Sequence, residues 1–182
     1  MRILTIVPFC LVVAACSGDE TNNQAAQAVP ESLPAGTWHA QFEVTSFAST
    51  DNSKPALKAK VGDKEQDSNC VTEAQRAQPA PELFVGSGYS CTYKTSYIKD
   101  GMINASLTCT RPEFKGEVAM SVQGSYTANG FEGTVDTNSY FPGTGDFTMS
   151  RKFKAVLTPG VCQPSSVEGG HATSDAKESK GG

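Results

Sequence analysis

The chain has 182 residues, with 19 acidic and 15 basic side chains, so its formal net charge at neutral pH is −4. This length favours a single folded domain, and the acidic balance argues against the basic surface typical of nucleic-acid-binding proteins. The main apolar run, residues 3–15, falls short of the roughly 20 residues that a membrane-spanning helix needs.

That apolar run predicts an export signal. Arg2 precedes it, and Val13-Ala14-Ala15-Cys16 closes it, which is the layout of a secretory signal peptide. The cysteine resembles the first mature residue of a bacterial lipobox, so we expect residues 1–15 to be removed and Cys16 to be acylated. Cleavage after Ala15 by ordinary signal peptidase is the alternative, and it would give a soluble periplasmic protein.

The expected location is the cell envelope of a Gram-negative bacterium. Ser17 follows Cys16, and in enteric-type sorting this resembles an outer-membrane address, with the protein facing the periplasm. Residues 16–34 and 163–182 are rich in small and polar residues, which predicts a disordered lipidated tether and a disordered C-terminal tail. The folded domain is therefore expected at residues 35–162.

Within the domain, apolar residues recur with the period of a β-strand. Residues 38–44 alternate apolar and polar side chains, which predicts a strand with one wet face. Residues 73–77 suit a short helical turn, which Pro79 would stop. Residues 89–98 and 102–110 form a predicted hairpin, with a three-residue turn around Gly101.

Two further hairpin strands, residues 117–127 and 131–140, are predicted from the Asn129-Gly130 turn signal, and residues 149–158 form the last predicted strand. The sequence therefore predicts a mainly β fold, a single antiparallel meander sheet with one short helical segment. Because such a sheet must cover its apolar face, we expect it either to curl into an open barrel or to have residues 73–84 lie over that face.

The cysteines predict two disulfides. Once Cys10 leaves with the signal peptide and Cys16 is acylated, four cysteines remain, an even number suited to an oxidising compartment. The hairpin register places Cys91 opposite Cys109, Tyr93 opposite Leu107, Thr95 opposite Ala105 and Tyr97 opposite Ile103. By elimination, Cys70 pairs with Cys162.

Several short motifs resemble one bacterial family. They are Pro34-Ala35-Gly36-Thr37-Trp38, Cys70-Val71-Thr72, the Cys91–Cys109 hairpin and Gly160-Val161-Cys162. The first is similar to the P-G-x-W opening of domain of unknown function 3617, with one additional alanine, and the second to its C-L-T element. This resemblance implies an exported protein or lipoprotein and offers no catalytic residue.

No motif in the sequence predicts catalysis, a cofactor or a metal. His39 lies on the polar face of the first strand and His171 in the tail, without partners at metal-ligand spacing. The sequence has no Gly-x-Ser-x-Gly elbow and no Cys-x-x-Cys pair. An active site assembled only in three dimensions stays open as a third possibility.

The leading interpretation is a non-enzymatic module that binds an envelope protein or has a structural role. The alternative is a carrier of a small apolar ligand or lipid within the curled sheet. The candidate contact loop carries Tyr140, Phe141 and Phe147 around the segment Pro142-Gly143-Thr144-Gly145. Aromatic rings are enriched at binding hot spots, but completing the core or the sheet edge is the more common role for such rings.

We predict that Cys16→Ala releases the protein from membranes or stalls its precursor. Several acyl chains together hold a protein at a bilayer far more firmly than one, and the variant lacks the thiol that starts their attachment. Membrane fractionation of cells making either form measures this. A variant that sediments with membranes as the natural chain does would contradict the lipid anchor.

Overall fold

Seven strands form one antiparallel sheet in the computed structural model, which describes residues 29–160 and 162. Cys16, the predicted signal peptide and the predicted tail lie outside the described residues. The elements in chain order are β1 Gly36–Ser49, β2 Lys64–Val71, the 3-10 turn η1 Glu73–Gln75, α1 Glu82–Val85, β3 Ser90–Lys99, β4 Met102–Thr110, β5 Val118–Tyr126, β6 Gly130–Ser139 and β7 Phe147–Thr158.

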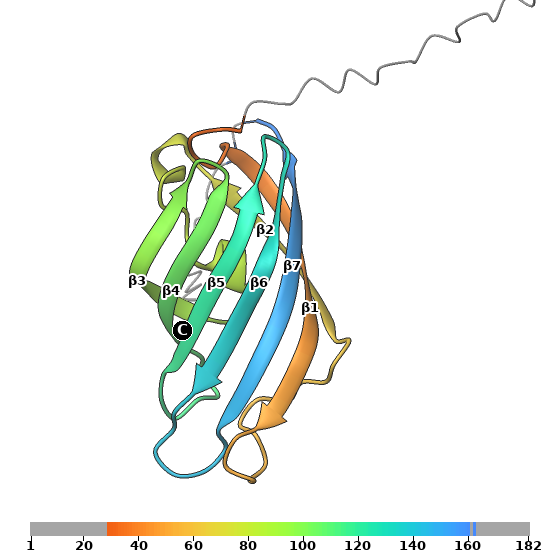
Figure 1. Cartoon of the computed structure of the whole chain (residues 1–182), viewed down its shortest axis with the longest axis vertical. Coiled ribbons are helices and arrows are strands. Elements are labelled where there is room, and N and C mark those ends of the chain that lie inside the picture. Colours follow the sequence, from red (N-terminus) through yellow and green to blue (C-terminus); the bar gives the residue numbers. More distant parts are fainter. Residues whose placement is uncertain (1–28, 161, 163–182) are drawn as a thin grey trace, which may run out of the picture.

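The strand order is β2-β1-β7-β6-β5-β4-β3, and the sheet curls into a half-barrel (Figure 1). Strands β3 to β7 follow one another as a meander, and the β1–β2 hairpin joins the sheet beyond β7. This confirms the predicted single curled antiparallel sheet. Strand β2 was not predicted, because its sequence KEQDSNCV lacks a clear apolar alternation.

The concave face of the sheet carries the core. Inward-facing residues alternate with exposed ones along β1 and β7, as predicted. The Trp38 ring lies 5.0 Å from that of Phe131, and Phe131 lies 5.6 Å from Phe153. These contacts join β1, β6 and β7 through their buried side chains.

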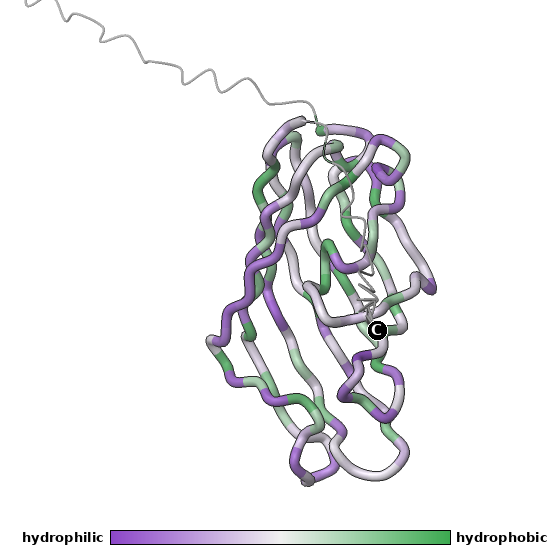
Figure 2. Tube along the Cα trace, turned by 180° about the vertical axis from the view of Figure 1, so that it is seen from behind, coloured by the Kyte–Doolittle hydropathy of each residue, from purple (hydrophilic) through white to green (hydrophobic). Residues whose placement is uncertain are grey.

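The segment between β2 and β3 crosses this concave face, in front of the sheet in the view of Figure 2. Its turn α1 buries Leu83, Phe84 and Val85 completely or nearly so. The Phe84 ring lies 5.5 Å from the Phe131 ring and 6.3 Å from the Phe153 ring. The predicted helical segment is confirmed as η1, and α1 adds a second short turn that begins after Pro81, a residue suited to helix starts.

Two glycines lie opposite each other in the sheet, where the neighbouring backbone and a core ring come too close for any larger residue. Gly124 in β5 lies opposite Gly133 in β6. A Cβ atom on Gly133 would lie 2.7 Å from the Phe153 ring and 2.1 Å from the Gln123 carbonyl oxygen. Glycine thus lets the Phe153 ring pack directly on the sheet.

The β3–β4 hairpin follows the predicted register only in its first half. Cys91 lies opposite Cys109 and Tyr93 opposite Leu107, as predicted, but a bulge then shifts the pairing. Because a bulge adds one residue to one strand, the predicted pairs of Thr95 and Tyr97 are wrong. They lie opposite Ser106 and Asn104 respectively.

The hairpin turn also has two central residues rather than three. Lys99 pairs with Met102, and Asp100 and Gly101 have φ angles of 52° and 78°. Positive φ at both positions is typical of a type I′ turn, which matches the twist of the strands. Because of the register shift at the bulge, the Tyr97 side chain is 48% exposed and the Ile98 side chain is buried in the core.

The β5–β6 hairpin is confirmed, but its turn lies one residue earlier than predicted. The Thr127 N–H donates to the Gly130 carbonyl oxygen over 2.8 Å, so Ala128 and Asn129 are the central residues. Gly130 already belongs to β6.

Both predicted disulfides are present. Cys91–Cys109 joins opposite residues of β3 and β4, with Cα atoms 4.1 Å apart. Cys70–Cys162 joins the end of β2 to the residues after β7, with Cα atoms 5.6 Å apart. Since β1 lies between β2 and β7 in the sheet, this second bridge spans the strand that opens the domain.

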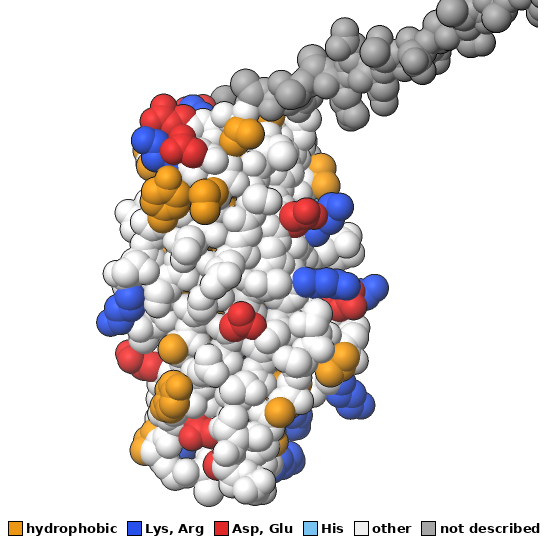
Figure 3. All heavy atoms as spheres, in the orientation of Figure 1, with side chains coloured by type: hydrophobic (Ala, Val, Ile, Leu, Met, Phe, Trp, Pro, Cys, Tyr) orange, Lys and Arg blue, Asp and Glu red, His pale blue; other side chains and the backbone are white. Residues whose placement is uncertain are grey.

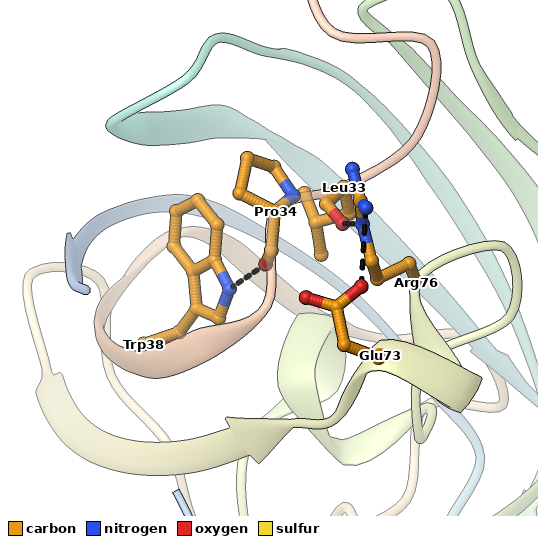
Figure 4. A network of polar contacts seen from close by, with 5 residues as sticks. All are labelled: Leu33, Pro34, Trp38, Glu73 and Arg76. Atoms are coloured by element: carbon orange, nitrogen blue, oxygen red, sulfur yellow. Dashed lines mark hydrogen bonds and ion pairs between the residues drawn. The ribbon is translucent and has the colours of Figure 1, made fainter. Parts of the chain in front are cut away.

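The domain begins a few residues earlier than predicted (Figure 4). The Trp38 indole N–H donates to the Pro34 carbonyl oxygen over 3.1 Å, and the Arg76 guanidinium donates to the Leu33 carbonyl oxygen over 3.1 Å. Arg76 is itself paired with Glu73 at 3.2 Å. Leu33 is fully buried, so the end of the segment we assigned to the tether is part of the fold.

Candidate functional site

The structure separates the three aromatic residues of the predicted contact loop. Tyr140 is 76% exposed, whereas Phe141 and Phe147 are buried. The Phe114 ring lies 5.2 Å from that of Phe141 and 5.9 Å from that of Phe147. Burial favours the core interpretation for the two phenylalanines, and Tyr140 is the ring that stands free for contact.

Two carboxylates hold this loop in place. Asp146 accepts hydrogen bonds from the Ser139 hydroxyl over 2.9 Å and from the Phe141 N–H over 2.8 Å. Asp51, in the β1–β2 connection, accepts the N–H groups of Gly145 over 2.7 Å and of Asp146 over 3.1 Å. The tip of the predicted contact loop is therefore held by hydrogen bonds to a second loop, a contact that we call the latch.

Hydrogen bonds lower the pKa of the Asp51 carboxyl well below its usual range. The largest cause is the Ser53 side chain, which donates over 2.7 Å, followed by the Ser53 backbone N–H over 2.9 Å. Desolvation opposes the shift, and the Asp146 and Gly145 N–H groups add to it. The latch thus depends on the ionised form of Asp51.

The convex face of the sheet is unusually poor in charge over two of its strands. Strands β4 (MINASLTCT) and β5 (VAMSVQGSY) contain no charged residue, although every second side chain of each points away from the core. These outward residues are small or uncharged: Asn104, Ser106, Thr108, Ala119, Ser121, Gln123 and Ser125. Figure 3 shows this face, with most charged side chains toward its margins.

Exposed aromatic and sulfur-containing side chains flank this uncharged surface. Tyr97 and Met102, both about half exposed, lie near the β3–β4 turn. Tyr140 follows β6 and lines a depression of about 310 Å³ together with Thr108, Ala119 and the carboxylate residue Glu117, which precedes β5 at the margin of this surface. We call the outward residues of β4 and β5, with Tyr140, the uncharged face.

A wider pocket of about 500 Å³ crosses β2, β1, β7 and β6. Its lining has three lysines and three glutamates, and Glu43 pairs with Lys152 at 3.3 Å and with Lys64 at 3.8 Å. The lining of this pocket therefore has no net formal charge.

The most distinctive buried charge is Arg151 of β7, on the concave side. It is only 4% exposed, and its guanidinium donates to the Glu65 carboxylate over 3.3 Å and to the Val85 carbonyl oxygen of α1. Its Nε is buried without a hydrogen-bond partner. Burial lowers the pKa of Arg151, and Tyr89 and Glu65 oppose that effect.

Arg151 shares its surroundings with a second guanidinium. The Tyr89 ring lies 4.6 Å from the Arg111 guanidinium and 5.7 Å from that of Arg151. Arg111 also pairs with Glu113 at 3.3 Å. Burial disfavours the charged form of Arg111, but Tyr89 and Glu113 outweigh it and raise its pKa.

Both guanidinium groups line a pocket of about 210 Å³. A neighbouring pocket of about 370 Å³ runs along the segment 54–60 and shares Leu57, Lys58, Ala59 and Asp63 with the first. We call the two together the Arg151 groove. Sequence reasoning missed it, although the alternation of KPALKAK at residues 54–60 was a readable signal of a cationic, half-buried strand-like segment.

His39 has an ordinary surface role, with its Nδ1 2.8 Å from the Ser68 hydroxyl. Within residues 29–160 and 162, no group of three His, Cys, Asp or Glu side chains has the arrangement of a metal site. No helix in the same part of the chain is long and apolar enough to cross a membrane.

Comparison with known proteins identifies the family. Residues 33–174 match the family model of DUF3617, described as a protein of unknown function. The chain belongs to the DUF3617 family. The match includes every strand of this DUF3617 domain, from β1 to β7. Comparisons with curated proteins and with solved structures found no match.

We predict that Asp51→Asn lowers the free energy of unfolding near neutral pH and that this loss fades in acid. A carboxyl whose folded pKa is depressed contributes its full stability above its unfolded pKa, about 4. That contribution is lost as the pH falls through the lower, folded value. Urea unfolding of both forms at about pH 7 and about pH 3 measures the difference.

Asp67→Asn is the matched control, because Asp67 accepts one N–H, from Ser68 over 2.8 Å. It should cost less than Asp51→Asn near neutral pH. An Asp51→Asn deficit that is the same at both pH values would contradict the latch.

Proposed function

We propose that this chain is a lipid-anchored protein of the Gram-negative cell envelope whose domain binds a protein partner rather than catalysing a reaction. Cys16 would hold it at the outer membrane, facing the periplasm, and residues 17–28 would carry the domain away from the bilayer. The uncharged face would make the contact.

The composition of the uncharged face carries this proposal. The central parts of protein interfaces are depleted of charged residues and enriched in Tyr and Met, and Ser and Ala are depleted there as well. The proposal therefore rests on the lack of charge and on the exposed rings and thioether, and not on the serines. Strands β4 and β5 have no charged residue, while Tyr97, Met102 and Tyr140 are exposed around them. Burying charged groups is costly unless they are paired, so a surface without charges can be covered at a smaller desolvation cost.

Covering the uncharged face would also cost little side-chain conformational entropy. Serine, threonine and alanine lose little rotamer freedom on burial, whereas lysine and glutamate lose up to about 2 kcal/mol each. The hydroxyl and amide groups can exchange hydrogen bonds with water for hydrogen bonds with a partner.

The alternative, a carrier of an apolar ligand, needs space within the curl of the sheet. In the described domain, Phe84 and its neighbours in α1 fill the centre of the concave face. A ligand enclosed there would have to displace α1, which favours the partner-binding proposal.

We predict that Ser106→Lys abolishes partner binding without unfolding the domain. Ser106 is exposed near the middle of β4, so the substitution adds one charge to the uncharged face and removes no core contact. Crosslinking in the native envelope, followed by mass spectrometry, measures which proteins each form captures.

Gln66→Lys is the matched control, because it adds the same charge on exposed β2, outside the uncharged face. Proteins captured by the natural chain and by Gln66→Lys, but lost from Ser106→Lys, support the proposal. If Ser106→Lys captures the same proteins with the same yield, the uncharged face is not the docking surface.

A further inference from the structure

We propose that the Arg151 groove binds an amphiphile with one acyl chain and an acidic headgroup, a carboxylate or a phosphate. The headgroup would lie beside Arg111 and Arg151, and the chain along Phe47 and Leu57. This site lies on the concave side, apart from the uncharged face, so it does not depend on the proposed partner.

The charge of the groove is opposite to that of the protein. The whole chain is acidic, with a formal net charge of −4. The groove is nevertheless lined by six cationic side chains against two carboxylates: Lys54, Lys58, Lys60, Lys64, Arg111 and Arg151 against Asp63 and Glu65. Glu113 and Glu43 pair with Arg111 and Lys64 from outside the lining, which leaves six cations against four carboxylates. A cleft lined by one sign of charge concentrates ligands of the opposite sign.

The two guanidinium groups make the headgroup end specific. Arginine presents a planar fork of donors that matches carboxylate and phosphate oxygens. Arg151 is buried, where charge interactions are stronger than in water, and its Nε lacks a partner. Its carboxylate partner Glu65 lies 3.3 Å away and balances its formal charge, so the excess positive charge of the groove comes from the lysines around it.

The other end of the groove is apolar beneath a cationic rim. Phe47, Pro55, Leu57 and Ala59 line the pocket of about 370 Å³. The lysines at 54, 58 and 60 are exposed, whereas Leu57 and Ala59 are half-buried. Lysine stems can lie along an acyl chain while their ammonium groups stay in water.

The volume agrees with this class of ligand. Small-molecule sites typically measure about 300–1,000 Å³, and the larger of the two neighbouring pockets alone measures about 370 Å³. The smaller pocket, about 210 Å³, provides room for a headgroup at the guanidinium end.

The test is titration calorimetry on residues 16–182 carrying Cys16→Ala, a form that lacks both the apolar run at residues 3–15 and the acylated thiol and so avoids detergent. The probes are dodecanoate and dodecyl phosphate below their micelle concentrations, dodecanol as the uncharged analogue, and acetate and inorganic phosphate as headgroups without a chain. We expect dodecanoate or dodecyl phosphate to bind about tenfold more tightly than dodecanol, because charge-assisted hydrogen bonds are the stronger ones. The two headgroup-only probes should not bind measurably.

Arg111→Gln should weaken binding of the acidic probe about tenfold and leave dodecanol unchanged. Lys58→Gln removes one positive charge from the exposed rim of the groove and leaves the contact between Arg111 and Tyr89 intact. It should weaken binding of the acidic probe severalfold. Lys152→Gln, on the opposite side of the sheet, is the matched control and should change nothing. Circular dichroism checks that each variant is folded.

Three results would overturn the proposal: equal affinity for dodecanol and dodecanoate, unchanged affinity in both Arg111→Gln and Lys58→Gln, or no binding of any monomeric amphiphile. Binding to anionic phospholipid vesicles alone, without binding of the monomeric probes, would also overturn it, because it would indicate a membrane-facing surface instead. None of these results bears on partner capture through the uncharged face.

Discussion

The fold depends on one constraint: a single curled sheet has one apolar face, and that face must be covered from within the same chain. The segment between β2 and β3 does this, and Phe84 is its centre, fully buried against Phe131 and Phe153. Because the cover lies on the concave side, the convex side stays exposed. The Arg151 groove also lies on the concave side, where the buried Arg151 guanidinium binds the Val85 carbonyl of α1.

Much of the fold could be predicted from local pattern. Alternation along β1 and β7 and the hairpin turn signals predicted six of the seven strands, and the number of mature cysteines with the pairing of Cys91 and Cys109 predicted both disulfides. The bulge after Tyr93 could not be predicted, because no residue type there requires it, and it moved Tyr97 to the surface. Strand β2 was not predicted, because it is an edge strand whose pairing with β1 depends on tertiary context rather than on its own periodicity.

The sites were harder to predict than the fold because they combine distant residues. Tyr89, Arg111 and Arg151 come from a loop before β3, a loop after β4 and the middle of β7, and only the curl of the sheet brings them together. The uncharged face was different, since the lack of charge in β4 and β5 is visible in the sequence. That this lack of charge defines a surface could be seen only in the structure, which shows that about half of those side chains are exposed.

The most direct test of this account is the free energy of unfolding of Phe84→Ala, measured by denaturant titration. If Phe84 closes the concave face, its removal should cost about 3–5 kcal/mol, as truncation of a fully buried ring does. Tyr97→Ala, which truncates a half-exposed ring, serves as the control and should cost far less. A Phe84→Ala variant as stable as the natural chain would contradict the claim that α1 completes the core.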